Sequence, residues 1–262
     1  MNLKEGKISA LQMAVLMFLY IIGDKVILLP ELAIAGRDVW LSTLLAAAYG
    51  LAPLFFIIKM RDIYPRKNLS GYLNETLGIY AGKTISLLYV AVLFFMAASS
   101  LRKTSDFLST AVMPGIDGII FTTVIVLTCI FLVYSGIETF GRVSIIFAGV
   151  LFATTIMLIA FNAKDFYLPH LIPLLRQGFN PIAKASVWSS QVVFGEIVLF
   201  SIITPNVDGV SKKKRQLYYV YILSSLIIIA TRLIPILVFG IALSEKLVYP
   251  FFENVRIIQM GE

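Results

Sequence analysis

Long, uninterrupted apolar runs constrain this chain more than any other feature of its sequence. The runs from Val39 to Ile58 and from Val143 to Ala163 contain no charged residue. A helix needs about 20 apolar residues to cross the hydrocarbon core of a bilayer. Only helices and closed barrels pair all their backbone polar groups there, and these runs lack the alternation of barrel strands. The sequence therefore predicts an all-α, polytopic transmembrane helical bundle.

The composition excludes several other classes of protein. Hydrophobic residues make up 59% of the 262 residues, and charged residues only 14%, against roughly 25% in soluble domains. A water-soluble globule of this size lacks the polar groups to cover so much apolar surface. The single cysteine, Cys129, excludes a disulfide-stapled module. The net charge of +7 lies in short loops, so we expect contact with membrane lipid and no nucleic-acid partner.

The sequence lacks the residue sets that carry catalysis or hold a cofactor. It has no phosphate-cradling glycine loop, no nucleophile–base set and no metal-ligand cluster, and His170 is its one histidine. We therefore expect no enzyme activity, no cofactor and no metal.

Seven apolar segments are long enough to be predicted as membrane spans. They are Ile8–Leu29, Val39–Ile58, Thr84–Leu101, Gly118–Ile137, Val143–Ala163, Ile182–Thr204 and Leu217–Leu243. Basic residues are more frequent in the loops that share a side with the N-terminus, and the densest cluster, Lys212–Arg215, is among them. By the positive-inside rule, the N-terminus is predicted to be cytoplasmic.

Spans one and six each carry a glycine followed by an acid deep within the apolar run. The pairs are Gly23-Asp24 and Gly195-Glu196. Glycine weakens a helix by about 1 kcal/mol relative to alanine, and a carboxylate at that depth costs about 2.5–3.5 kcal/mol. Two interrupted helices at corresponding positions of inverted halves are typical of a transporter-type binding site. Five helices make a repeat, so residues 1–163 form the predicted first repeat and residues 164–262 an incomplete second one. Ordinary glycine-containing helices with snorkelling acids are the alternative.

The two glycines are the candidate points where each helix unwinds and a ligand meets the backbone. Close helix packing is the alternative explanation for Gly23 and Gly195. Asp24 and Glu196 are candidates to bind a ligand ammonium, to carry a proton or to pair internally.

Two basic residues and one aromatic residue complete the candidate site. The charges within the spans are Asp24, Lys25, Glu196 and Arg232, and they sum to zero, so a purely structural network is also open. Arg232 is a candidate counter-ion for Glu196. Phe194 either covers the pocket as an aromatic gate or fills the core.

Several short motifs occur in a fixed order along the chain. They are Gly23 seven residues before Pro30, Ala35–Leu41, Tyr64-Pro65, Leu69–Leu73, Leu77-Gly78, Ala81-Gly82, Phe194–Glu196 and Lys212–Arg215. In this order they resemble the spore germination permease family, the B subunits of GerA-type germinant receptors within the amino acid–polyamine–organocation (APC) superfamily. The resemblance implies a LeuT-like bundle of ten helices in two inverted repeats. With seven predicted spans, the chain is expected to be a fragment that lacks spans eight to ten.

The resemblance also implies a function. A B subunit is expected to bind a small germinant, an amino acid or a sugar, and to trigger germination together with the receptor A and C subunits in the spore inner membrane. Val92 and Met96 of span three lie one turn apart, and the resemblance implies that they face the cavity; ordinary helix packing remains open. A secondary active amino acid transporter is the alternative function.

Overall fold

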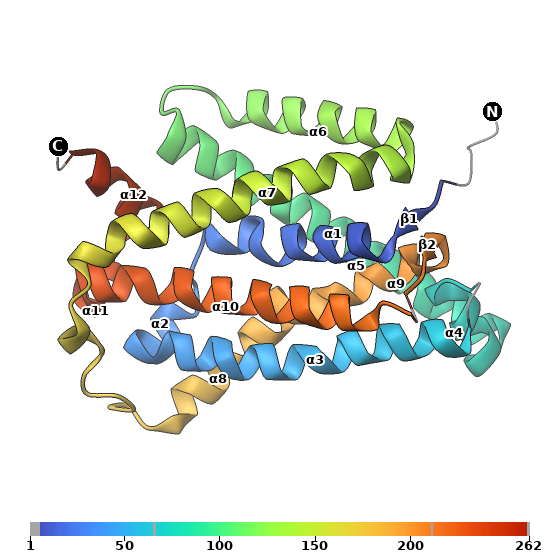
Figure 1. Ribbon diagram of the computed structural model, residues 1–262, viewed down its shortest axis with the longest axis horizontal. Helices are drawn as coiled ribbons and strands as arrows, with labels where there is room; N and C mark the ends of the chain where they lie inside the picture. Colours follow the sequence, from blue (N-terminus) through green and yellow to red (C-terminus); the bar gives the residue numbers. More distant parts are fainter. Residues whose placement is uncertain (1–5, 65–66, 211, 261–262) are drawn as a thin grey trace. The chain divides into compact units, whose positions relative to one another are not determined.

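The computed structural model describes residues 6–64, 67–210 and 212–260 (Figure 1), so Pro65 of the Tyr64-Pro65 motif lies outside the described residues. The all-α prediction is confirmed, since helix dominates these residues. The helices are α1 Ala10–Ile22, α2 Leu32–Ala35, α3 Val39–Ile63, α4 Leu69–Leu77, α5 Ile79–Phe107, α6 Gly118–Tyr134, α7 Gly136–Asn162, α8 Phe179–Ser189, α9 Phe200–Ile203, α10 Lys214–Phe239, α11 Ile241–Ser244 and α12 Pro250–Met260. The strands β1 Ile8–Ser9 and β2 Val207–Asp208 are two residues each.

Five helical segments among the described residues are long and apolar enough to cross a membrane. They are Leu32–Ile63, Ile79–Val112, Gly136–Asp165, Phe179–Asn206 and Lys214–Phe239. They coincide with predicted spans two, three, five, six and seven, while α6 and α1 fall within predicted spans four and one. The chain is an integral membrane protein built as a helical bundle.

The chain divides into two compact units. One gathers residues 6–16, 54–145 and 198–218, and the other gathers residues 17–53, 146–197 and 219–260. This is a different division from the predicted repeats, which therefore stay a prediction.

In the first unit, hydrogen bonds join residues 8–9 and Arg61 to the segment that contains Val207 and Asp208. Strands β1 and β2 pair in parallel, with Ile8 opposite Val207. Arg61 Nη2 donates to the Val207 carbonyl at 3.3 Å.

Helices α4 and α5 pack closely at Gly82, where a Cβ atom would lie 2.6 Å from the backbone nitrogen of Asn74. That approach explains why the Ala81-Gly82 motif needs a glycine at its second position.

Helix α5 presents apolar side chains outward along its length. Phe94 is 78% exposed and Phe95 73% exposed. Such a continuous apolar surface is unsuited to water and is typical of a helix that contacts lipid or another membrane helix.

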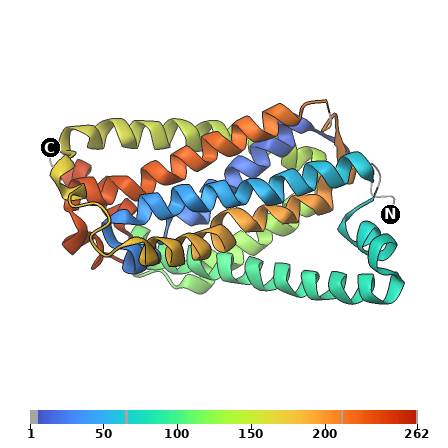
Figure 2. The same cartoon turned by 90° about the horizontal axis from the view of Figure 1, so that it is seen from below.

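The second unit has its core where α2 meets α8. Leu32 and Ala35 of α2 pack with Ala185 of α8 and Ile236 of α10. Residues 163–178, which join α7 to α8, can be followed in Figure 2 from yellow to gold. This connection is fastened within the unit, because Tyr167 N–H donates to the Leu237 carbonyl at 3.1 Å.

Candidate functional site

The helix of span one ends in the middle of its apolar run. Helix α1 stops at Ile22, and the Gly23 N–H still donates to the Leu19 carbonyl at 2.8 Å. A three-ten turn over Asp24–Val26 follows, and the chain returns to α-helix only at Leu32. Span one is therefore interrupted at the glycine that the sequence pattern indicated.

Span six changes its helix type at the matching glycine. After α8, a π-helical turn covers Ser190–Phe194, and a three-ten helix covers Gly195–Leu199 before α9 begins. The backbone of Gly195 keeps helical dihedral angles, with φ −70° and ψ −32°. The interruption here is a wide turn followed by a tight one, and the chain stays helical throughout. Such π turns are frequent at functional sites.

Both glycines are required by their own backbone. A Cβ atom on Gly23 would lie 2.8 Å from the Leu19 carbonyl oxygen, and one on Gly195 would lie 2.8 Å from the Ser190 carbonyl oxygen. In each case the obstructing atom belongs to the same span. The geometry of the helix interruption, and not close packing against a second helix, therefore accounts for the two glycines.

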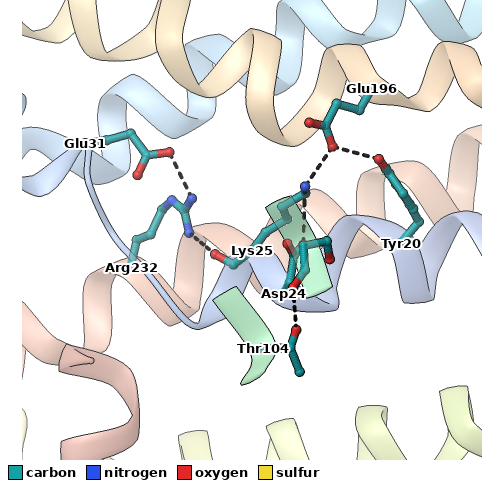
Figure 3. Close-up of polar contacts among 8 residues, drawn as sticks. Tyr20, Asp24, Lys25, Glu31, Thr104, Glu196 and Arg232 are labelled. Carbon is teal, nitrogen blue, oxygen red and sulfur yellow. Dashed lines mark hydrogen bonds and ion pairs between the residues drawn. The ribbon is translucent and has the colours of Figure 1, made fainter. Parts of the chain in front are cut away.

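A partly buried ionic cluster links the two interrupted spans within the second unit (Figure 3). Lys25 Nζ lies 2.7 Å from Glu196 Oε2 and 3.2 Å from Asp24 Oδ1. Tyr20 Oη donates to the same Glu196 oxygen at 2.7 Å. Lys25 comes from the three-ten turn of span one and Glu196 from that of span six. Three of the predicted site residues therefore lie together, and the two acids already contact an ammonium group of the protein itself.

A second buried pair lies beside this cluster and involves an acid that the sequence analysis missed. Arg232 Nη2 lies 3.1 Å from Glu31 Oε1, and Ser189 Oγ donates to the same oxygen at 2.9 Å. Arg232 and Glu31 are each 1% exposed. Arg232 therefore pairs with Glu31 and not with Glu196, because Lys25 occupies the place of the Glu196 counter-ion.

Glu31 changes the charge balance that the sequence indicated. With Asp24, Glu31 and Glu196 negative and Lys25 and Arg232 positive, the five formal charges sum to −1. Glu31 follows Pro30, just past the predicted end of span one. Its place directly before the apolar Leu32–Ala35 is the one hint of burial that its sequence context offers.

Phe194 fills the core of the unit. Its side chain is 0% exposed, and its ring lies 5.8 Å from that of Tyr221, centre to centre. The Tyr221 hydroxyl donates to the Ala47 carbonyl at 2.6 Å. A Cβ atom on Gly50 would lie 2.4 Å from Phe194 Cβ. Gly50 is thus a missed residue that allows this packing.

Val92 and Met96 lie on α5 in the first unit, apart from the sequence segments that form the ionic cluster. Val92 is 51% exposed and Met96 is half-buried. Their predicted place in the cavity stays a prediction.

A small cavity opens at the far end of the irregular stretch of span one. It has a volume of about 220 Å³, and Leu28, Pro30, Ser244 and Glu245 are among its lining residues. None of the predicted site residues lines it. In the part of the chain that the structure describes, no group of three or more acid, cysteine or histidine side chains is placed to hold a metal ion.

Comparison with known proteins places this chain in a family. The model of a family described as spore germination protein matches residues 7–262. Spore germination protein KB of Bacillus subtilis is 27% identical over 263 aligned positions, and the alignment spans 99% of this chain and 70% of that protein. Spore germination protein XB of Bacillus anthracis is 24% identical over 91% of this chain and 67% of its own length. Spore germination protein YndE of B. subtilis is 21% identical over 68% of this chain and half of its own length. No solved structure matches the chain.

Proposed function

Because the chain belongs to the spore germination permease family, we propose that it is the integral membrane subunit of a spore nutrient-germinant receptor. In this proposal it binds a small germinant at the interrupted centres of spans one and six, and this binding triggers germination. The role is that of a receptor and not of an enzyme.

One observation carries the proposal: the break of span one lies against the altered helix of span six, with the Lys25–Glu196 pair between them. A charged side chain at the centre of a bilayer costs about 2.5–3.5 kcal/mol. Irregular backbone at that depth is tolerated where it is buried in protein or lines a cavity. Two costly features at one position are explained by a functional site there, and this supports the proposal.

The chemistry of the interrupted spans and of the ionic cluster suits a small polar germinant. An interrupted helix offers backbone N–H groups at one end and carbonyl groups at the other, which suit a carboxylate and an ammonium. The net charge of −1 on the cluster adds attraction for a positive group. We propose an amino acid as the germinant, with a sugar as the second class.

The family also suggests partners and a location. We propose that the chain assembles with the receptor A and C subunits in the spore inner membrane, with its N-terminus in the cytoplasm. We further propose that spans one to five and the segment from residue 164 onward are inverted copies of one another.

A secondary active amino acid transporter is the second candidate. Paired, buried charges beside interrupted helices also suit a substrate and proton pathway.

Deletion and restoration of the complete gene tests the receptor proposal. Spores of the deletion strain are exposed to a panel of amino acids and sugars, and germination is followed by loss of optical density. We expect at least one solute to lose its effect on deletion and to regain it on restoration. An unchanged response to every solute, together with concentrative amino acid uptake into vesicles that contain the protein, supports the transporter and contradicts the receptor.

A further inference from the structure

Arg232 contacts both ends of the irregular stretch of span one. Its Nη1 donates to the Lys25 carbonyl at 3.4 Å, and its Nη2 donates to Glu31 Oε1 at 3.1 Å. Arg232 lies on α10, a continuous helix, and is 1% exposed. One buried guanidinium therefore bridges the beginning and the end of the segment that leaves the α-helix.

The Lys25 contact concerns the backbone at the point where the α-helix has ended. A buried carbonyl must find a donor, because an unpaired one is costly in a medium without water. At Lys25 the guanidinium is such a donor (Figure 3). The same backbone position carries the side chain that reaches Glu196 at 2.7 Å.

The Glu31 contact fixes the other end. Glu31 precedes α2 and also accepts a hydrogen bond from Ser189 Oγ on α8 at 2.9 Å. The carboxylate is thus held from two helices, and the guanidinium neutralises its charge.

We infer that Arg232 is a positioning residue, which sets the shape of residues 23–31 by holding the Lys25 carbonyl and Glu31 at once. The inference rests on the proposed function in so far as that stretch forms the germinant site. Through the backbone of Lys25, Arg232 also fixes where the Lys25 ammonium meets Glu196. Lysine cannot replace it fully, since an ammonium is a compact point charge and lacks the planar fork of donors that reaches two acceptors at once.

Alkylation of a cysteine in the stretch tests the inference without any germinant. In the full-length protein in native membranes, Cys129 and any cysteine encoded beyond residue 262 are replaced by serine, and Leu28→Cys places a reporter beside the cavity. The rate of reaction with N-ethylmaleimide measures how tightly the stretch is held. Gln177→Cys, an exposed position in the loop before α8, is the matched control reporter.

We expect Arg232→Gln to raise the alkylation rate of the Leu28→Cys reporter about fivefold or more, and Arg232→Lys to raise it about twofold. The alkylation rate of the Gln177→Cys reporter should stay constant. Glu31→Gln combined with Arg232→Gln removes both charges and still leaves the Lys25 carbonyl without the guanidinium, so its rate should stay raised. An unchanged rate in Arg232→Gln overturns the inference. So does a return to the parent rate in the double variant, since Arg232 would then act only by neutralising Glu31.

Two further measurements cover a variant that does not accumulate and separate the positioning role from the germinant site. If Arg232→Gln does not accumulate in the membrane, Arg232→Lys decides, and an unchanged rate there overturns the inference. The germination response of the same strains to the amino acid and sugar panel tests the proposed function separately. A raised alkylation rate with an unchanged response supports the positioning role and contradicts the germinant site at this stretch.

Discussion

At the scale of single residues, Gly23 and Gly195 show how a local backbone requirement marks a site. Each glycine has a carbonyl of its own span at a distance that a Cβ atom cannot tolerate. The sequence identified both positions because a glycine beside an acid is costly in an apolar run. It left two causes open, an interruption of the helix and close helix packing, and the atoms nearest to each glycine belong to its own span.

Alanine at either glycine should destabilise the protein. Gly23→Ala and Gly195→Ala each place Cβ 2.8 Å from a carbonyl oxygen, and local strain of this kind costs about 1–3 kcal/mol. We expect the melting temperature of the purified, full-length protein to fall by several degrees for each variant. Gly149→Ala is the control, because nothing lies within 4 Å of its Cβ position. Equal melting temperatures for all three variants would show that the backbone does not need these glycines.

Alanine at Gly50 should act through packing. A Cβ atom there meets Phe194 Cβ at 2.4 Å and the Tyr221 hydroxyl at 2.3 Å, and overpacking of a core costs about 1–3 kcal/mol. Thermal unfolding should show a loss of that size for Gly50→Ala. Adding Tyr221→Phe removes one obstruction only, so it should not restore the parent stability; full restoration would exclude Phe194 as an obstacle.

The Lys25–Glu196 pair should behave as a coupled unit. Lys25→Met removes the cation and leaves two acids beside each other, and breaking a buried pair costs about 3–5 kcal/mol. Adding Glu196→Gln should recover part of that loss. A double-mutant cycle by chemical unfolding should therefore give a coupling of about 0.5–3 kcal/mol. Strict additivity of the two changes would mean that the pair does not form.

At the scale of elements, the contact of α4 with α5 explains a motif that was noted only as a resemblance. Gly82 meets Asn74 with Cβ distances of 2.4–2.7 Å, and the backbone of α4 is among the contacts. Gly82→Ala should therefore displace α4 from α5. Hydrogen exchange of the α4 amides in the full-length protein should become at least tenfold faster, while that of α10 stays unchanged. Protection of α4 at the parent level would refute the close approach.

The elements that the sequence predicted best are the long apolar helices, since their length and lack of charge need no tertiary information. Helix α1 ends at Ile22, one residue before the glycine where the sequence predicts an interruption of span one. The short helix α2 and the buried role of Glu31 were missed, because Pro30 ended the apolar run and Glu31 then resembled a loop residue. Span six was expected to unwind, whereas Gly195 joins two helix types. A sequence pattern does not distinguish an unwound helix from a change of helix type, because both need only a weakened α-helix.

At the scale of the whole molecule, composition alone indicated a membrane bundle, and motif order indicated the family. Which charges pair with which could not be predicted, because Lys25 and Arg232 each had two acids within plausible reach and only packing selects between them. The choice of Val92 and Met96 came from resemblance, and their place in a cavity stays a prediction.

The central claim is that a small germinant binds where the interrupted spans meet. Spores that carry Gly195→Leu in the complete gene, with the protein at its normal level, test it through the germinant concentration for half-maximal germination. Gly149→Leu, on a helix face with open space, is the control. The account predicts at least a tenfold higher concentration for Gly195→Leu, or no response, and an unchanged value for the control. An unchanged value for Gly195→Leu would contradict it.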